Sequence, residues 1–397
     1  MTLELSKVVA RVSDMGRSAA QRASARAATA PRVRDLLRAH RVDSQLREKV
    51  ERAVKLRWVG AIPQAEPLDA AIDPPTLPDR ITLVAADGSQ IYPDRHSVAL
   101  YYVVNVGSIV LRLGTGETPM TESEPTVCFD DDDLFGEDDY PVPAQVINAR
   151  RAVAEMARLA TIAVEEARLA PTVALADGNI ALRVQQEGIS ARERTRLEHD
   201  YIAQLDRLRG ARIATASFIS RPGATSIVRL MQLAEECTLD TVAEFVKNSK
   251  GRPYDGINDT PVFDALLEPG QRSAVFRAAA TQWSAPYERA GHAIHFFYLN
   301  VGTLAQPNIA RVEIPEWAAS DSGQLGLAHA ALVEQCRVTA SAYPYVLTRA
   351  DELAVITSAE KANFEQMIGV EMLRRGIEAR PSDKAATKAF ARYGKRR

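Results

Sequence analysis

Three short runs rich in β-branched and aromatic residues follow one another after residue 80, and this composition predicts β-strands. They cover residues 81–86, 97–106 and 108–113. Turn-forming residues separate the runs, and the first run ends at an Asp-Gly pair, Asp87 and Gly88. The pattern therefore predicts three consecutive antiparallel strands, with Asp87 at the exit of the first.

Further along the chain, apolar runs alternate with longer amphipathic stretches, which predicts strands alternating with helices. The expected strands cover residues 172–176, 212–220, 292–300 and 309–314, and the expected helices cover 144–170, 190–209, 324–336 and 358–377, with another helix after Pro222. A meander followed by this alternation predicts an α/β fold, with a mixed β-sheet flanked by helices. An RNase H-like core fits that order.

The segments outside this core differ from it in composition. Residues 1–60 are rich in Ala, Arg, Leu and Val, which predicts a helical N-terminal region broken near Pro31. Residues 61–79 contain five prolines, which disfavour helices and strand pairing alike and predict a linker. We expect the main domain at residues 80–370 and a basic tail at 371–397.

The chain has 397 residues, of which 46% are hydrophobic, so it can bury a substantial core. No run approaches the roughly 18 to 20 apolar residues of a membrane helix, and the N-terminus lacks the layout of a signal peptide. We therefore expect a cytoplasmic protein without a membrane segment. Three widely spaced cysteines suggest neither a disulfide framework nor a cysteine zinc site.

The net charge of −2 conceals an uneven distribution. Arginines outnumber acids near the N-terminus, and basic residues dominate the tail, so either end could contact a phosphate backbone. A solvated helix face explains the N-terminal pattern as well. Acidic residues gather at 117–143 without periodicity, which predicts a long surface loop. Whether this loop shields a binding site or only keeps the surface soluble stays open.

Two Asp-Gly pairs carry the candidate chemistry, because Asp87 and Asp177 each follow a mostly apolar strand. A carboxylate in such a place is costly unless it is paired or binds a metal. Two converging carboxylates would suit Mg²⁺ or Mn²⁺, which can orient water for in-line attack on a phosphodiester. Asp-Gly is also a favoured turn dipeptide, so either pair alone has a structural explanation.

Between residues 83 and 356 a series of ordered motifs resembles the NurA nuclease family. The motifs are Asp87-Gly88-Ser89; a helix with Arg150, Arg151 and Glu155; Asp177-Gly178; Pro261-Val262-Phe263-Asp264 with Arg272-Ser273; Phe296-Phe297-Tyr298-Leu299; Arg311-Val312-Glu313-Ile314-Pro315-Glu316-Trp317; Tyr343-Pro344-Tyr345-Val346-Leu347; and Ala350-Asp351-Glu352-Leu353-Ala354-Val355-Ile356. Their order and spacing carry the resemblance. It implies an RNase H-like nuclease, usually a homodimer, that uses manganese and docks onto a hexameric HerA-type ATPase to resect DNA ends.

Carried over by position, the resemblance makes Asp87 the first metal ligand and Asp177 its strand-borne partner. It also implies a glutamate from the intervening helix, for which Glu155 is our choice. Glu165 and Glu166 compete for this role, but they lie nearer the C-terminal end of the helix, where a negative charge is less favourable.

The family commonly has a histidine in an Ala-His-Glu context where this chain has Asp351. A histidine could bind a metal or transfer a proton near neutral pH, whereas Asp351 can still coordinate a hard cation. With Asp351 in place of this histidine, the chain has either a metal site richer in carboxylates or a reduced nuclease activity. Tyr343 and Tyr345 fall where the family places a tyrosine near the site, and such a ring can contact a phosphate or simply pack.

Several other residues are expected to be structural. Arg311 and Glu313 alternate in a strand and should pair on one face, although Arg311 could also contact a phosphate. His292 and His295 have no further histidine nearby to complete a zinc set. The chain contains no G-x-x-x-x-G-K-[ST] motif, which suits a nuclease whose ATPase motor is a separate polypeptide.

The main hypothesis is a metal-dependent DNA nuclease, an exonuclease or endonuclease, that uses Mn²⁺ or possibly Mg²⁺ and processes DNA ends with a HerA-type ATPase. Its metal and catalytic residues are Asp87, Glu155, Asp177 and Asp351, with Tyr343 as a further catalytic residue. The alternative is a catalytically weakened NurA-like platform for an ATPase ring in DNA repair or anti-phage defence, which Asp351 supports. Another RNase H-like enzyme would share the acidic centre without requiring the later motifs.

Overall fold

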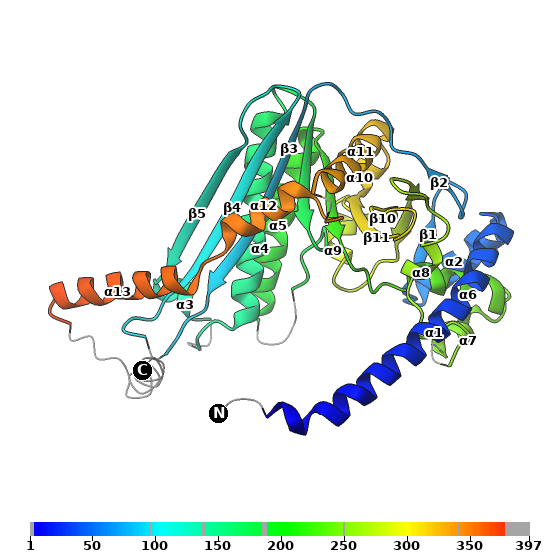
Figure 1. Ribbon diagram of the computed structural model, residues 1–397, viewed down its shortest axis with the longest axis horizontal. Helices are drawn as coiled ribbons and strands as arrows, with labels where there is room; N and C mark the ends of the chain where they lie inside the picture. Colours follow the sequence, from blue (N-terminus) through cyan, green and yellow to red (C-terminus); the bar gives the residue numbers. More distant parts are fainter. Residues whose placement is uncertain are drawn as a thin grey trace. The chain divides into compact units, whose positions relative to one another are not determined.

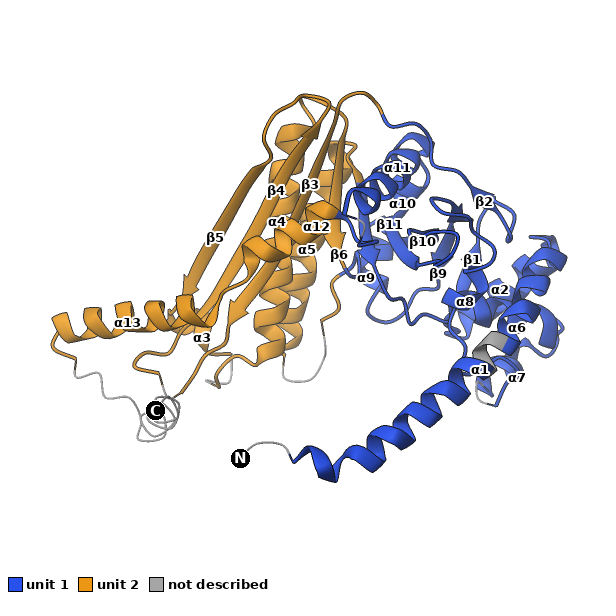
Figure 2. Ribbon diagram, in the orientation of Figure 1, with its two compact units in different colours: residues 1–77, 178–181, 215–344 blue, residues 78–177, 182–214, 345–397 orange. Residues whose placement is uncertain are grey.

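The structure is a computed structural model. It describes residues 4–95, 97–136, 140–184, 189–248, 251–339 and 341–377, without the side chains of 25–27. The chain forms two compact units, each assembled from separate segments (Figure 2). Unit 1 comprises residues 1–77, 178–181 and 215–344, and unit 2 comprises residues 78–177, 182–214 and 345–397.

Unit 2 contains a mixed β-sheet with helices on both faces (Figure 1). Strands β3 (Ile81–Ile91), β4 (Tyr102–Leu113) and β5 (Met120–Cys128) form an antiparallel meander, and β6 (Thr172–Asp177) runs parallel to β3. The helices are α3 (Asp131–Leu134), α4 (Ala144–Glu166), α5 (Ala191–Gly210), α12 (Tyr345–Ala354) and α13 (Ser358–Arg374). The predicted mixed sheet flanked by helices is confirmed, whereas the RNase H-like assignment stays a prediction.

The predicted meander is present, but its strand limits were wrong. Strand β3 does not stop before Asp87, because β4 pairs with it from Ile81 to Ile91. The second and third predicted strands are one strand, β4, and the true third strand is β5, within the segment 117–143 that was predicted to be a loop. Strand β5 lies at an edge with nearly all its side chains exposed, so no apolar alternation marked it in the sequence.

In unit 1, a second set of strands surrounds β10 (Ile294–Asn300) and β11 (Ile309–Pro315), which pair with each other. Strand β7 (Ala214–Ile219) pairs with β11, and β8 (Arg272–Ser273) and β9 (Phe276–Ala278) pair with β10. The proline-rich segment adds β1 (Ala61–Pro63), paired with β9, and β2 (Ala71–Ile72), paired with β8. The prediction of a linker without strand pairing was therefore wrong; both strands are short, which leaves most of the prolines outside the ladders.

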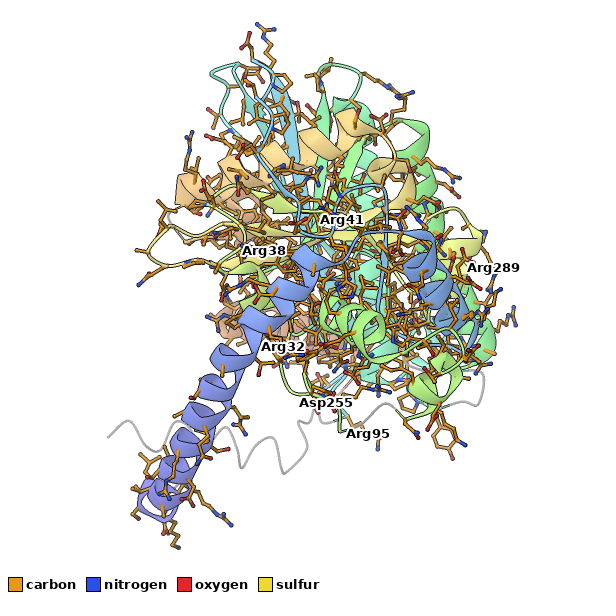
Figure 3. All side chains as sticks on the ribbon, turned by 90° about the vertical axis from the view of Figure 1, so that its right-hand side faces the viewer. Arg32, Arg38, Arg41, Arg95, Asp255 and Arg289 are labelled. Carbon is orange, nitrogen blue, oxygen red and sulfur yellow. The ribbon has the colours of Figure 1, made fainter. Side chains whose placement is uncertain are left out.

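The helices of unit 1 enclose a core that includes Val33, Leu37, Phe263, Phe296 and Tyr298. They are η1 (Leu5–Lys7), α1 (Val9–Ala39), α2 (Ser44–Lys55), α6 (Ser226–Glu236), α7 (Val242–Lys247), α8 (Thr260–Phe263), α9 (Ala285–Arg289), α10 (Glu316–Ala319) and α11 (Ser322–Thr339). Figure 3 shows Arg32 and Arg38 projecting from α1, with Arg41 just beyond it.

Helix α1 is continuous through Pro31, so the predicted break at that residue was wrong. A proline inside a helix costs about 3 kcal/mol. Burial of Ala30, Val33 and Leu37 against the core opposes that cost. The real break follows residue 39, and α2 begins after Asp43, whose Oδ1 accepts a hydrogen bond from the backbone N–H of Leu46 at 2.8 Å.

The later predicted strands and helices appear as β6, β7, β10, β11, α4, α5, α6, α11 and α13, with ends shifted by a few residues. Helix α12 was not predicted. Most of the predicted basic tail, residues 378–397, lies outside the described residues, as do residues 137–139 of the acidic segment. Within the described ranges, no helix is long and apolar enough to cross a lipid bilayer.

Candidate metal centre

Asp87 lies within β3, directly opposite Gly107 of β4. Opposed residues of an antiparallel pair point to the same face of the sheet. A Cβ at Gly107 would lie 2.4 Å from the backbone nitrogen of Ala354 and 2.5 Å from the carbonyl oxygen of Ala350, so α12 packs directly on this face. Asp87 therefore faces the helix that carries Asp351.

Two polar side chains of the sheet hold the C-terminal end of α12. Asn105 Nδ2 donates a hydrogen bond to the carbonyl oxygen of Ala354 at 2.8 Å, and Ser89 Oγ donates to the same oxygen at 2.5 Å. Ser89 and Asn105 are themselves opposed in the β3–β4 pair. Because carbonyls in the last turn of a helix lack intrahelical donors, these contacts fix the end of α12 beside Asp87.

Gly88, the next residue of β3, points to the opposite face, where α4 packs (Figure 1). A Cβ at Gly88 would lie 2.5 Å from Glu155 Oε1 and 2.9 Å from Arg151 Cγ. The φ angle of Gly88 is not among the positive values. Glycine is therefore required here by the close approach of Glu155, and not by the turn that the Asp-Gly pair predicted.

Asp177 is the last residue of β6 and lies level with Asp87. The parallel register pairs Ala85 with Leu175, and two further residues along each strand lead to Asp87 and Asp177. Gly178 follows with a φ of 77°, in the left-handed region that favours glycine. The second Asp-Gly pair thus ends its strand, as predicted.

The pKa values of Asp87 and Glu155 show that the acidic groups interact. Burial raises the pKa of Asp87 to about 6, with further increases from the charges of Asp351 and Asp177 and from a hydrogen bond with the carboxyl of Asp351. The N–H of Gly88, which donates to Asp87 Oδ1 at 2.8 Å, opposes this shift. Burial also raises the pKa of Glu155 to about 8, and the charges of Asp87 and Asp177 add to it while Arg151 opposes it.

In unit 2, Asp87 on β3 interacts electrostatically with Asp177 on β6 and Asp351 on α12, and Glu155 on α4 interacts with Asp87 and Asp177 from the other face of the sheet. All their ligand atoms are carboxylate oxygens, which suit hard cations such as Mg²⁺ and Mn²⁺. In the described part of the chain, no three acidic, histidine or cysteine side chains already stand close enough together to hold an ion. A bound cation would have to draw these carboxylates towards itself.

One buried oxygen of Glu155 has no hydrogen-bond partner within the described ranges. Its Oε1 lies 3.1 Å from Arg151 Nε as an ion pair, but the angle does not permit a hydrogen bond, and both buried atoms lack a hydrogen-bond partner. Arg151 Nη1 instead donates to the carbonyl oxygen of Gly88 at 3.0 Å. A buried acceptor without a donor is costly, and a cation would satisfy it, so the residues present fit a divalent metal ion.

The other candidate acids and tyrosines lie elsewhere. Glu165 is exposed on α4, and Glu166 forms two hydrogen bonds of 2.7 Å with Arg112. Tyr343 belongs to unit 1, where its ring packs edge-on against Phe218 at a centroid distance of 5.4 Å. Tyr345 is the first residue of α12.

The expected structural pair is present in unit 1. Arg311 Nε donates to Glu313 Oε1 at 3.0 Å, and the guanidinium lies over the ring of Phe296. His292 Nδ1 accepts a hydrogen bond of 3.0 Å from Trp317 Nε1, and His295 is buried. These residues support the sheet of unit 1.

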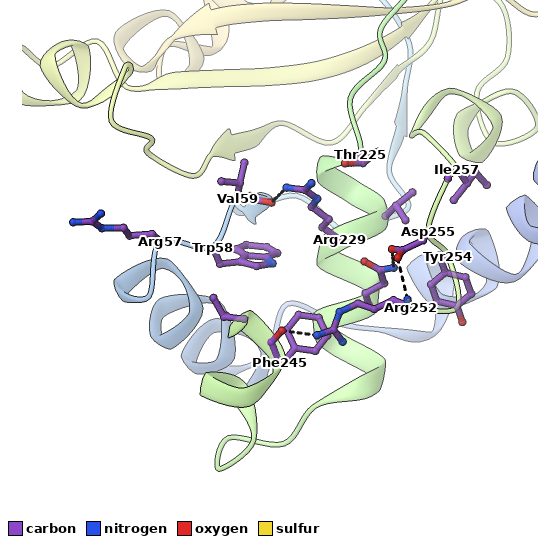
Figure 4. A pocket seen from close by; sticks show the side chains of 14 residues that line it. Arg57, Trp58, Val59, Thr225, Arg229, Phe245, Arg252, Tyr254, Asp255 and Ile257 are labelled. Atoms are coloured by element: carbon purple, nitrogen blue, oxygen red, sulfur yellow. Dashed lines mark hydrogen bonds between the residues drawn. The ribbon is translucent and has the colours of Figure 1, made fainter. Parts of the chain in front are cut away.

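The pocket in Figure 4 also belongs to unit 1 and is separate from the acidic residues. It has a volume of about 350 Å³, and Trp58 and Phe245 form part of its wall. Its two inward arginines are engaged by the protein, because Arg229 donates to the carbonyl oxygen of Val59 and Arg252 lies over Phe245.

Sequence reasoning named Arg151 and Ser89 only as motif residues, without a role, and it missed Asn105 and Gly107. One signal was available, because Arg151 and Glu155 are four residues apart and so share a face of their helix. The contacts of Ser89 and Asn105 with α12 have no local signal, because they span 265 and 249 residues of sequence.

Comparison with known proteins places the chain in a family of nucleases. The NurA domain matches residues 81–356, so the chain belongs to the NurA family. Among solved structures, the NurA nuclease from Sulfolobus solfataricus is 14% identical, with 83% of this chain and 92% of that chain covered and a TM-score of 0.40.

Two further crystal structures are similar to the chain. One, of NurA with manganese, is 9% identical, with 85% and 95% of the two chains covered and a TM-score of 0.38. The other, of NurA bound to dAMP and manganese, is 11% identical, with 91% and 96% covered and a TM-score of 0.38. At these identities and TM-scores the likeness supports no statement about the ligands of this chain. No curated protein sequence matches it.

Proposed function

We propose that this chain is a metal-dependent deoxyribonuclease that uses Mn²⁺ or Mg²⁺ to cleave phosphodiester bonds during DNA end processing. One observation carries the proposal, namely the interaction of Asp87 with Asp351 and Asp177, and of Glu155 with Asp87 and Asp177, in a domain of the NurA family. Gathering like charges in a partly buried place is unfavourable unless a cation compensates them.

The residues of the chain would bind and orient the reacting groups. Asp87 and Asp177, level with each other on neighbouring strands, would supply the central ligands, and Glu155 and Asp351 would complete the set from α4 and α12. A bound divalent ion supplies Lewis-acid chemistry that polarises the phosphodiester and activates water. The contacts of Ser89 and Asn105 with Ala354 would hold Asp351 in place. A phosphate contact by Tyr343 remains a separate proposal.

We also propose DNA as substrate, a homodimer as the working form, and a HerA-type hexameric ATPase as partner. The chain contains no P-loop motif of its own, so ATP-driven movement along DNA would need a separate motor. Size-exclusion chromatography with light scattering tests the dimer, and cleavage measured with and without the ATPase tests the partnership.

The decisive test is cleavage of end-labelled linear DNA in Mn²⁺ or Mg²⁺ by the wild type and by Asp87→Ala and Asp177→Ala. Both variants should lose cleavage and keep the unfolding midpoint of the wild type. Asp206→Ala is a matched control, because Asp206 lies on α5 of the same unit and pairs with Arg209. Continued cleavage by Asp87→Ala or Asp177→Ala would remove that residue from the proposed centre.

A second candidate function is a NurA-like platform that binds an ATPase ring while cleaving DNA weakly, in repair or anti-phage defence. The supporting observation is Asp351, an acid where the resemblance leads us to expect histidine. If Asp351 limits catalysis, Asp351→His should raise the Mn²⁺-dependent rate, because neutral imidazole both binds metals and transfers protons near pH 7. A fall in the rate would instead favour an active centre built on four carboxylates.

A further inference from the structure

A polar strip, starting at Glu155, lies where α4 packs against β3. It consists of Glu155, Arg151 and Asn148 from α4 and of Gly88, Gln90 and Tyr92 from β3 and the residue after it. The helix residues recur at intervals of three and four, which places them on one face. The strand residues alternate, so they share the face that packs against α4.

Hydrogen bonds connect the two sides of this strip along its length. Arg151 joins α4 to the carbonyl oxygen of Gly88. Further along, the hydroxyl of Tyr92 donates to Asn148 Oδ1 at 2.5 Å and accepts from Gln90 Nε2 at 2.8 Å. Gln90 Oε1 is buried and has no hydrogen-bond partner among the described residues. The strip thus leads from the acidic centre to Tyr92 and includes polar groups that the protein itself leaves unsatisfied.

Tyr92 is both fixed and exposed. Its hydroxyl is held from two sides, yet 39% of the residue remains accessible to solvent. A tyrosine with a satisfied hydroxyl would normally gain stability by burying its ring. An aromatic ring held in place at the surface is the arrangement on which proteins stack the bases of single-stranded nucleic acids.

The length of the strip sets the position of such a base. Gly88 and Tyr92 are four positions apart along the strand, a distance of about 13 Å at about 3.3 Å per residue. Glu155 and Asn148 are seven positions apart along the helix, a distance of about 10 Å at about 1.5 Å per residue. A stacked DNA strand advances about 3.4 Å per nucleotide, so Tyr92 lies about three to four nucleotides from a phosphate at Glu155, and fewer if the strand is stretched.

We propose that this strip is a binding subsite for a single DNA strand and that it leads to Glu155 of the proposed metal centre. Tyr92 provides the platform for one base, while Arg151, Gln90 and Asn148 provide charge and hydrogen bonds for the backbone and base edges. Stacking of this kind tolerates any base sequence, as an enzyme that shortens DNA from its ends requires. The inference rests on the proposed nuclease function and specifies how its substrate is held.

The test measures binding of short single-stranded DNA to the full chain by fluorescence anisotropy, with EDTA present to prevent cleavage. Tyr92→Leu should weaken binding about tenfold, within the usual range for loss of one stacked base. Tyr92→Trp should bind at least as tightly as the wild type, because it enlarges the platform. Tyr140→Leu is the matched control, because Tyr140 lies in the same unit with 76% of its surface exposed.

A second measurement locates the stacked base. Oligonucleotides carrying 2-aminopurine at each of the first five positions from either end report stacking as a loss of fluorescence. Quenching should be greatest at one position three to four nucleotides from an end and should disappear in Tyr92→Leu. A merely structural role of Tyr92 would not produce this dependence on position.

The outcomes separate the two proposals. If the wild type does not bind DNA, the proposed function fails together with the subsite. If the wild type binds DNA but Tyr92→Leu and Tyr92→Trp match it in affinity and in the pattern of quenching, the subsite is wrong and the nuclease proposal stands. The Trp variant retains an aromatic ring, so the test remains informative if the Leu variant fails to fold.

Discussion

Replacing Gly88 by alanine should remove activity while leaving the protein folded. The added Cβ would lie 2.5 Å from Glu155 Oε1, which must retreat by about 0.9 Å to reach the ordinary contact distance of 3.4 Å. Arg151 Cγ, at 2.9 Å, limits the direction of that retreat. A misplacement of about 1 Å at a reacting centre can cost about 10²-fold in rate, so we expect cleavage in Mn²⁺ to fall by at least that factor.

The accompanying loss of stability should be small. Overpacking a well-packed position costs about 1 to 3 kcal/mol, while replacing glycine within a strand recovers roughly 0.5 to 1 kcal/mol. The free energy of unfolding should therefore fall by about 0 to 2.5 kcal/mol, which a typical domain tolerates. The expected signature is a large loss of activity with a modest loss of stability.

Three measurements check this prediction, namely the initial rate of cleavage of end-labelled DNA, the affinity for Mn²⁺ by calorimetry, and urea unfolding. Gly210→Ala is the control, because Gly210 ends α5 in the same unit and a Cβ there meets nothing within 4 Å. That variant should match the wild type in rate and affinity. A Gly88→Ala protein with both the rate and the Mn²⁺ affinity of the wild type would refute the placement of Glu155.

Two further predictions concern the same centre. In Gly107→Ala, the three atoms nearest to the added Cβ would be backbone atoms of α12, at 2.4 to 2.7 Å, so the helix must move. We expect urea unfolding to show about 2 to 3 kcal/mol of destabilisation, together with a loss of cleavage. Unchanged stability would argue against this packing. Without metal, the raised pKa values of Asp87, about 6, and Glu155, about 8, mean that the folded state binds more protons than the unfolded state between pH 4 and these values. Stability should therefore fall as pH rises from about 4 to 8, less steeply in Asp87→Asn, with Mn²⁺ opposing the fall. Thermal unfolding in EDTA that is equally steep in both proteins would contradict the shift at Asp87.

The sequence located much of the core of this fold, because apolar runs and amphipathic periods mark buried elements directly. Strand β6 and helices α4 and α5 appear close to their predicted limits. Strand β5 was missed because an exposed edge strand has no apolar face, and the break at Pro31 was wrong because burial of α1 outweighs the local cost of proline. Local sequence patterns thus failed where an element is stabilised mainly by its contacts with neighbouring elements.

In the candidate metal centre, too, local sequence patterns indicated some residues, while others depend on contacts between distant segments. Asp87, Asp177 and Glu155 lie on elements that the sequence indicated, although Asp87 is inside its strand and not at its end. Asp351 came only from the family resemblance, because the ten residues of α12 were not recognised as a helix. The dipeptide Asp-Gly reads identically at Gly88 and at Gly178, but one glycine accommodates a side chain from α4 and the other adopts a positive φ.

The hydrogen bonds from Ser89 and Asn105 to Ala354 have a consequence for the order of events during synthesis. They join segments 265 and 249 residues apart, so α12 cannot dock until nearly the whole domain has left the ribosome. A nascent chain ending before residue 345 carries Asp87, Glu155 and Asp177 without Asp351 or the helix that covers the face of Asp87. Under the proposed function, a nascent chain that has not yet released α12 would therefore lack the complete centre and could not cleave DNA.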